Sequence, residues 1–363
     1  MTVRLKDIAQ DLGLSVVTVS KVLRNHPDIG EVTRKRVLQR MKELNYQPNL
    51  AARSLITGRT WTLGLVVPDL LHPFFAKLAK IISEEVRKKG YSLFISSSEE
   101  DPALEQEEIA QFLARRVDVM LVASSQVSAE NFQRLDEQKI PFILLDRRFS
   151  GFASNFVGVD DVAAGRLATE HLIEQGCQRI AHIRGPERIS TAAGRMEGYR
   201  QALAAHGLSP DPNLVVSIGP SADHAGDDAG YREAAKLLAL ANRPDGIFCY
   251  NDPIALGAMR AIFDAGLKIP GDVALVGCGN LSYSDLLRVP LTSVDQNSRT
   301  IGKIASSMAL KLAQKKISPP PRSELVVPQL VVRASSLRRP AVPVSPNENR
   351  QREGCRSIRS VLT

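Results

Sequence analysis

Cysteine is scarce in this sequence of 363 residues, and its four cysteines lie far apart. Cys177, Cys249, Cys278 and Cys355 form no C-x-x-C pair, so their spacing indicates neither a zinc site nor a disulfide framework. Three of the four lie in apolar stretches, where we expect them to be small core residues.

Long apolar runs are also missing. None approaches the roughly 18 residues that a membrane-spanning helix needs. The first ten residues, MTVRLKDIAQ, contain no apolar segment of the kind found in secretory signal peptides. We therefore expect a cytoplasmic protein without a membrane partner.

The sequence contains no motif typical of catalysis. It has no GxSxG, no P-loop, no Rossmann GxGxxG and no HExxH. The six histidines, at positions 26, 72, 171, 182, 206 and 224, form no cluster with the spacing of metal ligands. We interpret the chain as neither an enzyme nor a protein with a cofactor or metal. A doubly wound α/β enzyme is the alternative.

Positive charge is concentrated at the two ends of the chain. Residues 1–60 carry eleven Lys and Arg against five Asp and Glu, and residues 338–363 carry six Arg against two Glu. Because the whole chain has a net charge of +8, the middle is slightly acidic. A basic head on a near-neutral body indicates a polyanion-binding module joined to a different domain. A basic surface that serves only solubility is the alternative.

Apolar residues in the head recur at helical spacing. The pattern predicts helices over residues 5–11, from the N-cap Ser15 through Leu23, and from Glu31 to Leu44, with a break at Gly13. A short helical stretch, NLAARSL, follows Pro48. The sequence thus predicts an all-α helix-turn-helix domain over residues 1–48 and a hinge helix and linker over 49–59.

The second predicted helix has one apolar face and one face for DNA. Val19 and Val22 would pack on the first helix. The residues expected at the DNA are Ser15, Val16, Val17, Thr18, Ser20, Lys21 and Asn25. The valines can contact thymine methyl groups, Lys21 a guanine or phosphate, and Thr18, Ser20 and Asn25 phosphates. A three-helix bundle without a nucleic-acid role is the alternative.

From residue 60 onward, short apolar runs alternate with helical patterns, which predicts βαβ units and parallel sheets. The number of strands favours a body of two α/β lobes over residues 60–337. We place the N-lobe at about 60–160 plus 293–322 and the C-lobe at about 161–290 plus 323–337. Residues 338–363 are rich in Pro, Asn and Arg without periodicity, which predicts a disordered basic tail.

RLKDIAQDLGLSVVTVSKVL and TRKRVLQRMKELNYQPNLAARSL resemble the head of the LacI/GalR family of bacterial transcription regulators. In that family, NxxARxL forms a hinge helix on operator DNA, and the paired hinge leucines of a dimer kink the minor groove. The resemblance adds Tyr46, Asn49, Ala52 and Leu55 to the DNA-contacting residues. Packing of Leu55 on the body is the alternative. Many family members have Ser or Thr where Arg4 caps the first helix here.

The resemblance extends to about residue 337 and implies a body similar to periplasmic sugar-binding proteins, with an effector between the lobes. The residues it places at the effector are Phe74, Phe75, Ser124, Asp146, Arg147, Arg195, Asn251, Asp252 and Asn280. Each has a structural alternative: the phenylalanines as core, Arg195 as a surface ion pair. Asp252 is expected first as an N-cap, and one of Asp160 and Asp161 as the cap of the helix over 162–175.

The effector itself stays open. Sugar-responsive relatives carry an acidic residue where this chain has Gly279, and Ala225 stands where the purine-responsive relative has an aromatic contact. The resemblance implies a repressor, active in carbohydrate metabolism, that binds a palindromic operator as a homodimer, since residues 340–363 contain no apolar heptad. A sugar-binding protein without DNA readout, or a regulator that answers to a non-sugar ligand or a protein partner, is the alternative.

Overall fold

The computed structural model describes residues 3–23, 26–46, 54, 58–219, 226–314 and 320–338. The chain divides into two units, Met1–Thr60 and Trp61–Thr363, which we call the head and the body. Asn25, Asn49, Ala52 and Leu55 lie outside the described residues, as does the predicted tail beyond residue 338. Among the described residues, no helix is both long and apolar enough to span a bilayer.

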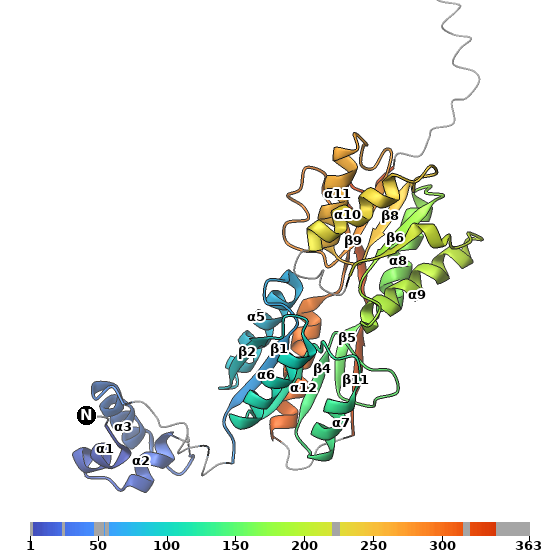
Figure 1. The fold of residues 1–363 in the computed structure, drawn as a ribbon. Coiled ribbons are helices and arrows are strands. Elements are labelled where there is room, and N and C mark those ends of the chain that lie inside the picture. The colour runs from blue at the N-terminus through green and yellow to red at the C-terminus, as the bar shows by residue number, and fades with distance from the viewer. Residues whose placement is uncertain are drawn as a thin grey trace, which may run out of the picture. The chain divides into compact units, whose positions relative to one another are not determined.

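Where the structure describes the head, its helices include α1 (Leu5–Leu12), α2 (Val16–Leu23) and α3 (Glu31–Glu43). One side of each is buried in a common core, formed by Ile8, Ala9, Val19, Val22, Val37 and Met41. Gly13 ends α1 with a φ of 63°, a conformation that favours glycine. Figure 1 shows this helical unit in blue. The apolar spacing therefore predicted the head helices correctly.

The caps of α1 and α2 differ in chemistry. Ser15 caps α2 as predicted, because its Oγ accepts the Thr18 N–H at 3.0 Å. Arg4 stands at the N-cap of α1, and its side chain has no acceptor to offer. The Asp7 carboxylate instead accepts the Arg4 N–H at 2.8 Å, which is half of a capping box. Asp7 therefore offsets part of the stability that the family's usual cap would provide.

The N-lobe of the body is a six-stranded parallel sheet in the order β11-β5-β4-β3-β1-β2. The strands are β1 (Thr62–Val67), β2 (Ser92–Ser97), β3 (Val119–Val122), β4 (Phe142–Leu145), β5 (Phe156–Val159) and β11 (Ser323–Val326). Helices α5 (Pro73–Arg87) and α12 (Ser298–Gln314) pack on one face. Helices α6 (Pro102–Ala114) and α7 (Glu130–Glu137) cover the other (Figure 1).

The C-lobe is a second six-stranded sheet in the order β12-β10-β9-β8-β6-β7, in which only β12 is antiparallel to its neighbour. The strands are β6 (Ile180–Arg184), β7 (Val215–Ser217), β8 (Gly246–Cys249), β9 (Ala274–Cys278), β10 (Thr292–Asp295) and β12 (Gln329–Val331). Helices α10 (Gly226–Leu238) and α11 (Asp252–Asp264) cover one face. Helices α8 (Asp161–Glu174) and α9 (Ser190–Ala205) cover the other, and a 3-10 turn, η1 (Pro212–Leu214), precedes β7.

Two strands belong to the opposite lobe from the one that the sequence predicted. We placed residue 293 onward in the N-lobe, but β10 pairs with β9 of the C-lobe. We placed residue 323 onward in the C-lobe, but β11 pairs with β5 of the N-lobe. The chain thus crosses between lobes after β5, β10 and β11 (Figure 1). Apolar patterning shows that a strand exists but not which sheet edge it pairs with, and that caused the error.

Glycines allow unusually close helix packing in the C-lobe. A Cβ on Gly198 of α9 would lie 2.0 Å from the Val162 carbonyl oxygen of α8, and one on Gly165 would lie 2.1 Å from the Arg195 carbonyl oxygen. The backbones of α8 and α9 are therefore in direct contact. This packing brings Arg195, on α9, to the N-terminus of α8, where Asp161 lies.

Candidate functional site

Helix α2 presents the short apolar surface expected of a DNA-reading helix. Val16 and Val17 are 45% and 62% exposed, whereas Val19 and Val22 are buried against the other head helices. The Ser15 and Thr18 hydroxyls lie 2.8 Å apart at the start of the helix. Ser20 and Lys21 are half-buried. The predicted DNA face of α2 is thus exposed at its two valines and polar at its N-terminus.

Lys21 is engaged within the head. Its Nζ lies 2.5 Å from an Asp28 carboxylate oxygen, and the other oxygen of that carboxylate lies 2.6 Å from His26 Nδ1. The hydrogen bond from Lys21 holds the pKa of Asp28 below its usual range. Lys21 must leave Asp28 to reach a base or phosphate. Tyr46 packs against the head core, and its partial burial raises its pKa.

In the body, the carboxyl ends of the strands of the two lobes face each other. His72 follows β1 and lies 3.3 Å, Nε2 to Nδ2, from Asn251, which follows β8. Arg188 follows β6 and donates from Nη1 to the Ser125 carbonyl, after β3, at 3.0 Å. The Arg148 N–H, after β4, donates to Ser190 Oγ at the start of α9 at 3.0 Å. Asn251 is one of the effector residues predicted from the resemblance, and it takes part directly in a contact between the lobes.

Glu100 joins the two lobes through a shared carboxylate. It accepts hydrogen bonds from Arg147 of the N-lobe at 2.9 and 2.5 Å and from Arg188 of the C-lobe at 3.2 Å. Glu100 and Arg147 are both buried, so these charges are only weakly screened by solvent. Arg147 also donates to the Ser124 carbonyl at 3.3 Å. Its guanidinium is thus bound by protein groups rather than directed at an open cleft.

Ser124 is committed to a buried carboxylate. Its Oγ donates to Glu105 Oε1 at 2.7 Å, and the Ser125 N–H donates to the second oxygen of Glu105 at 2.5 Å. Glu105 lies in α6 and is fully buried, and burial raises its pKa. The Ser124 hydroxyl therefore fixes α6 to the end of β3 in this structure.

Arg195 connects four segments of the C-lobe. Its Nε donates to Asp161 at 3.0 Å, and its Nη1 and Nη2 donate to the Tyr250 carbonyl at 2.6 Å and to Gln296 at 3.2 Å. Its guanidinium also lies 4.6 Å from the centroid of the Tyr250 ring. Burial raises the pKa of Asp161, and the Arg195 charge opposes that shift. Arg195 is buried, so the surface ion pair considered for it is wrong.

Asp146 Oδ1 and His72 Nδ1 lie at the interface and are among the buried polar atoms that have no hydrogen-bond partner in the described residues. Asn251 Oδ1 accepts the Ile254 N–H at 2.9 Å, so its Nδ2 is the atom that donates to His72 Nε2. A neutral His72 then carries its proton on Nδ1. Burial lowers the pKa of His72 to about 4, which keeps it neutral near pH 7. These two atoms therefore offer a donor and an acceptor that suit a hydroxyl-bearing ligand.

Asp146 is held in a backbone conformation that is uncommon for residues other than glycine. Its φ is 61°, in the left-handed region. Burial raises the pKa of its carboxyl group, although Arg195 and Arg147 both act to lower it. A buried carboxylate needs hydrogen-bond donors, and ligand hydroxyls can supply them. Asp146 is the predicted effector residue whose surroundings fit that role best.

Asp252 is not the N-cap that the sequence predicted. Asn251 caps α11, and Asp252 is the first residue inside the helix. The Asp252 carboxylate is fully buried and accepts from the Leu281 N–H at 2.9 Å and from the Ser293 hydroxyl at 2.6 Å. Both residues can cap a helix, and the backbone at Asn251, which is extended, decided between them. Asp160 caps α8 through the Ala163 N–H at 3.0 Å, as predicted.

The remaining predicted effector residues are part of the packing. Asn280 Nδ2 donates to Asp295 at 3.0 Å, and its Oδ1 accepts from Arg333 at 2.7 Å. Phe74 and Phe75 are both buried in the N-lobe core, which fits their structural alternative. Phe75 also lies at the interface, since its ring centroid is 5.4 Å from that of His72.

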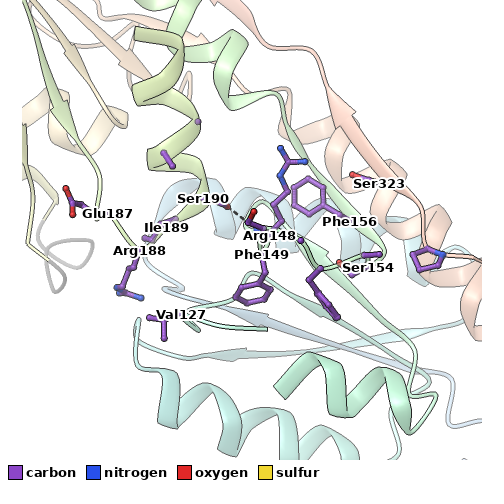
Figure 2. Close-up of a pocket in the computed structure, with 17 residues that line it drawn as sticks. Val127, Arg148, Phe149, Ser154, Phe156, Glu187, Arg188, Ile189, Ser190 and Ser323 are labelled. Atoms are coloured by element: carbon purple, nitrogen blue, oxygen red, sulfur yellow. Dashed lines mark hydrogen bonds between the residues drawn. The ribbon is translucent and has the colours of Figure 1, made fainter. Parts of the chain in front are cut away.

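A cavity of about 880 Å³ opens beside this interface (Figure 2). Its walls are the loop between β4 and β5, including Arg148, Phe149 and Phe152, and the segment before and into α9, including Arg188 and Ser190. None of the predicted effector residues lines it. Sequence reasoning missed Glu100, Arg148 and Arg188. The signal was present, because each follows a strand as the predicted residues do.

Two family models match the chain. Residues 4–49 match bacterial regulatory proteins of the lacI family, and residues 60–324 match the periplasmic binding proteins and sugar binding domain of the LacI family. The protein belongs to the LacI family. The ribose operon repressor of Halalkalibacterium halodurans is 33% identical over 332 residues, 92% of this chain and 96% of that protein. The transcriptional regulator GalR of Escherichia coli is 32% identical over 342 residues, 94% and 97% of the two chains.

Solved structures of transcription regulators have the same fold. The Lac repressor dimer bound to operator and the anti-inducer ONPF superimposes with a TM-score of 0.82 at 25% identity, covering 93% of this chain and all of that one. The regulator CelR in complex with cellobiose superimposes with a TM-score of 0.70 at 28% identity, covering 92% and 99%. An N-terminal helical head and a two-lobed α/β body are therefore established for this chain.

The low pKa of His72 leads to a pH prediction. The unfolded chain binds the His72 proton below about pH 6.5, whereas the folded protein binds it only below about pH 4. Acid therefore stabilises the unfolded state first, and stability is lost as pH falls from 6.5 towards 4. From pH 7 to pH 5 we expect the unfolding free energy of wild type to fall by about 2 kcal/mol more than that of His72→Gln. Urea unfolding of both proteins at each pH measures this, and a difference independent of pH would contradict it.

Proposed function

We propose that the protein is a transcriptional repressor that binds a palindromic operator as a dimer. A small effector that binds between the lobes raises or lowers its affinity for the operator. The observation that carries the proposal is α2, a capped helix of a helix-turn-helix with Val16 and Val17 exposed beyond a buried face. The relatives named above support it, since they include an operon repressor and a repressor solved on its operator. Such a protein acts in the cytoplasm, where its DNA is, and performs no catalysis.

The DNA contacts we propose are those predicted from the sequence. Val16, Val17 and Lys21 read base edges in the major groove, and Ser15, Thr18 and Ser20 hold the backbone. The exposed valines and the polar N-terminus of α2 support this assignment. Asn25, Tyr46, Asn49, Ala52 and Leu55 complete it. Leu55 would enter the minor groove from the hinge, because an apolar wedge between base steps bends DNA.

We propose a sugar or sugar derivative as the effector. The supporting observation is the buried pair of a donor at His72 Nδ1 and an acceptor at Asp146 Oδ1, which suits ligand hydroxyls. Gly279 has a φ of 141°, so an acidic residue at this position would be strained. Asp146 would then be the carboxylate that binds the sugar. The CelR structure with cellobiose provides a relative with a sugar ligand.

We assign the dimer contact of the N-lobe to the edge of its sheet. Strand β2 has a neighbour on one side only, and Phe94 and Ile95 on it are 44% and 41% exposed. An exposed apolar edge strand favours self-association unless it is covered. A two-fold dimer would cover it and would also place two heads on the half-sites of a palindrome. The Lac repressor relative is a dimer.

The first experiment is selection of genomic DNA fragments by the purified full-length protein. We expect enrichment of a palindromic consensus, whose neighbouring genes would identify the pathway and narrow the effector. Salt-sensitive binding without any consensus would contradict the proposal, because it would mean a basic head without sequence readout. It would favour the alternative, a sugar-binding protein that does not regulate DNA.

The hinge wedge has its own test, Leu55→Ala. We expect specific operator affinity to fall at least tenfold, because the variant cannot fill the kinked base step. Affinity for unrelated DNA should stay unchanged, because it depends on the charges of the head. Fluorescence anisotropy with operator and scrambled duplexes at two salt concentrations measures both. Equal operator affinity of variant and wild type would remove Leu55 from the interface.

A further inference from the structure

The cavity of about 880 Å³ lies between the β4–β5 loop of the N-lobe and the start of α9 in the C-lobe. It is a separate feature from the Asp146–His72 site, because neither residue lines it. Figure 2 shows Arg148, Phe149 and Phe156 on its N-lobe side and Arg188 and Ser190 on its C-lobe side. Its volume is within the range of pockets that enclose small metabolites.

Cationic side chains prevail in this cavity. Arg148 and Arg188 line it, and the acidic lining residue is Glu187. Glu187 is 76% exposed and is already paired with Arg184 at 2.9 Å, so it adds little negative potential inside. The Arg148 guanidinium lies 5.4 Å from the centroid of the Phe156 ring, and no described carboxylate lies within ion-pair distance of it. The Arg148 charge is therefore available to an anion that enters the cavity.

The backbone of Arg148 is fixed from the opposite wall. Its N–H donates to Ser190 Oγ at 3.0 Å, the dashed line in Figure 2. The ring of Phe156 supports one face of the guanidinium. An arginine whose backbone is hydrogen-bonded and whose guanidinium is stacked on a ring loses little conformational freedom on binding, which favours recognition of an oxyanion.

Phenylalanine rings give the same cavity apolar walls. The Phe149 ring packs on Phe132 at 5.4 Å between centroids, and the Phe152 ring is stacked with Phe142 at 6.4 Å. Both rings are thus anchored in the N-lobe core while another face of each lines the cavity. Fixed aromatic surfaces favour a ligand with a planar or apolar part. A ligand that fits both features carries an oxyanion on such a part.

We propose that this cavity is a second ligand site, which binds an organic anion through Arg148 and Arg188 and through the phenylalanine wall. The shared chemistry is an oxyanion, phosphate or carboxylate, on a compact planar or apolar skeleton. Whether an anion binds this site does not depend on the proposed function. Any change that the bound anion makes to operator affinity does rest on that function.

Binding at this site would act on the closure of the lobes. Arg188 joins the C-lobe to the N-lobe through the Glu100 carboxylate at 3.2 Å and the Ser125 carbonyl at 3.0 Å. An anion that binds Arg188 competes with Glu100 for the same guanidinium. The ligand therefore opens this bridge unless it forms an equivalent one, and the equilibrium between open and closed bodies shifts accordingly.

The test uses the full-length protein and four probes in isothermal titration: phenyl phosphate, benzoate, inorganic phosphate and the neutral phenyl β-glucoside. We expect phenyl phosphate or benzoate to bind more tightly than inorganic phosphate, and the stronger of the two identifies the oxyanion. Arg148→Gln should weaken that binding at least tenfold. The matched variant Arg200→Gln, on the exposed side of α9 and outside the cavity, should leave it within twofold. Circular dichroism verifies that both variants are folded.

Two results would overturn the proposal: no saturable binding of either aromatic anion in the millimolar range, or equal binding by wild type and Arg148→Gln. Phenyl β-glucoside distinguishes the two sites, because we expect it at the Asp146–His72 site. Its binding should be lost in Asp146→Asn and kept in Arg148→Gln. Operator affinity without ligand, measured on the same samples, tests the proposed function separately. If wild type binds the operator but neither aromatic anion, the result counts against this site alone.

Discussion

Gly198→Val should cost the body more than about 3 kcal/mol of unfolding free energy. A Cβ at this position would lie 2.0 Å from the Val162 carbonyl oxygen and 2.6 Å from the Arg166 amide nitrogen. Both atoms belong to the α8 backbone, so no side-chain rotation can relieve the contact. Overpacking in a core typically costs about 1–3 kcal/mol. Here the backbones of two helices would have to move apart, so we expect the cost to exceed that range.

Gly271→Ala is the matched control in the same lobe. A Cβ there would have its nearest contact at 3.7 Å, from Lys268, and no positive φ is required. We expect this variant to unfold within about 1 kcal/mol of wild type, because alanine mainly restricts the unfolded chain. Urea unfolding followed by circular dichroism compares the three proteins. If Gly198→Val and Gly271→Ala are equally stable, α8 and α9 do not pack as described.

Arg195→Ala should destabilise the body by about 3–5 kcal/mol and abolish the effector response. Truncation removes the ion pair with Asp161 and leaves that carboxylate buried without its counter-charge, which is the costly way to break a buried pair. It also frees the Tyr250 carbonyl and Gln296 from their donor. Because Arg195 ties α9 to the segment where β10 leaves the C-lobe, its loss loosens the lobe at its junction.

Arg200→Ala provides the control, since Arg200 lies on the exposed side of the same helix. It should change stability by less than about 0.5 kcal/mol. The head is a separate unit, so operator binding by Arg195→Ala should persist at temperatures where its body stays folded. Urea unfolding and operator anisotropy, with and without ligand, measure these effects. Wild-type stability with a lost response would mean that Arg195 acts on the effector directly rather than through packing.

The residues of the effector interface show where sequence reasoning reached its limit. The motifs PFILLDRRF and FCYNDP correctly indicated that polar side chains gather where β4 and β8 end. They did not show that Arg147 is bound to Glu100, that Ser124 is bound to Glu105, or that Asn251 rather than Asp252 caps α11. The first two depend on which side chains meet in space, and the partners are 47 and 19 positions apart in the chain. The third depends on the extended backbone at Asn251.

Much of this protein was determined by the sequence alone, because the deciding physics is local. Apolar periodicity and the Ser15 cap determine the head helices, and the alternation of strand and helix patterns determines an α/β body with parallel sheets. Tertiary structure decided what local patterns cannot encode. It assigned β10 to the C-lobe sheet and β11 to the N-lobe sheet, the reverse of the prediction, since strand pairing is a long-range choice. It also placed Arg188 on Glu100 and buried Asp146 Oδ1 and His72 Nδ1 without a hydrogen-bond partner among the described residues, because burial and partners exist only once both lobes have formed.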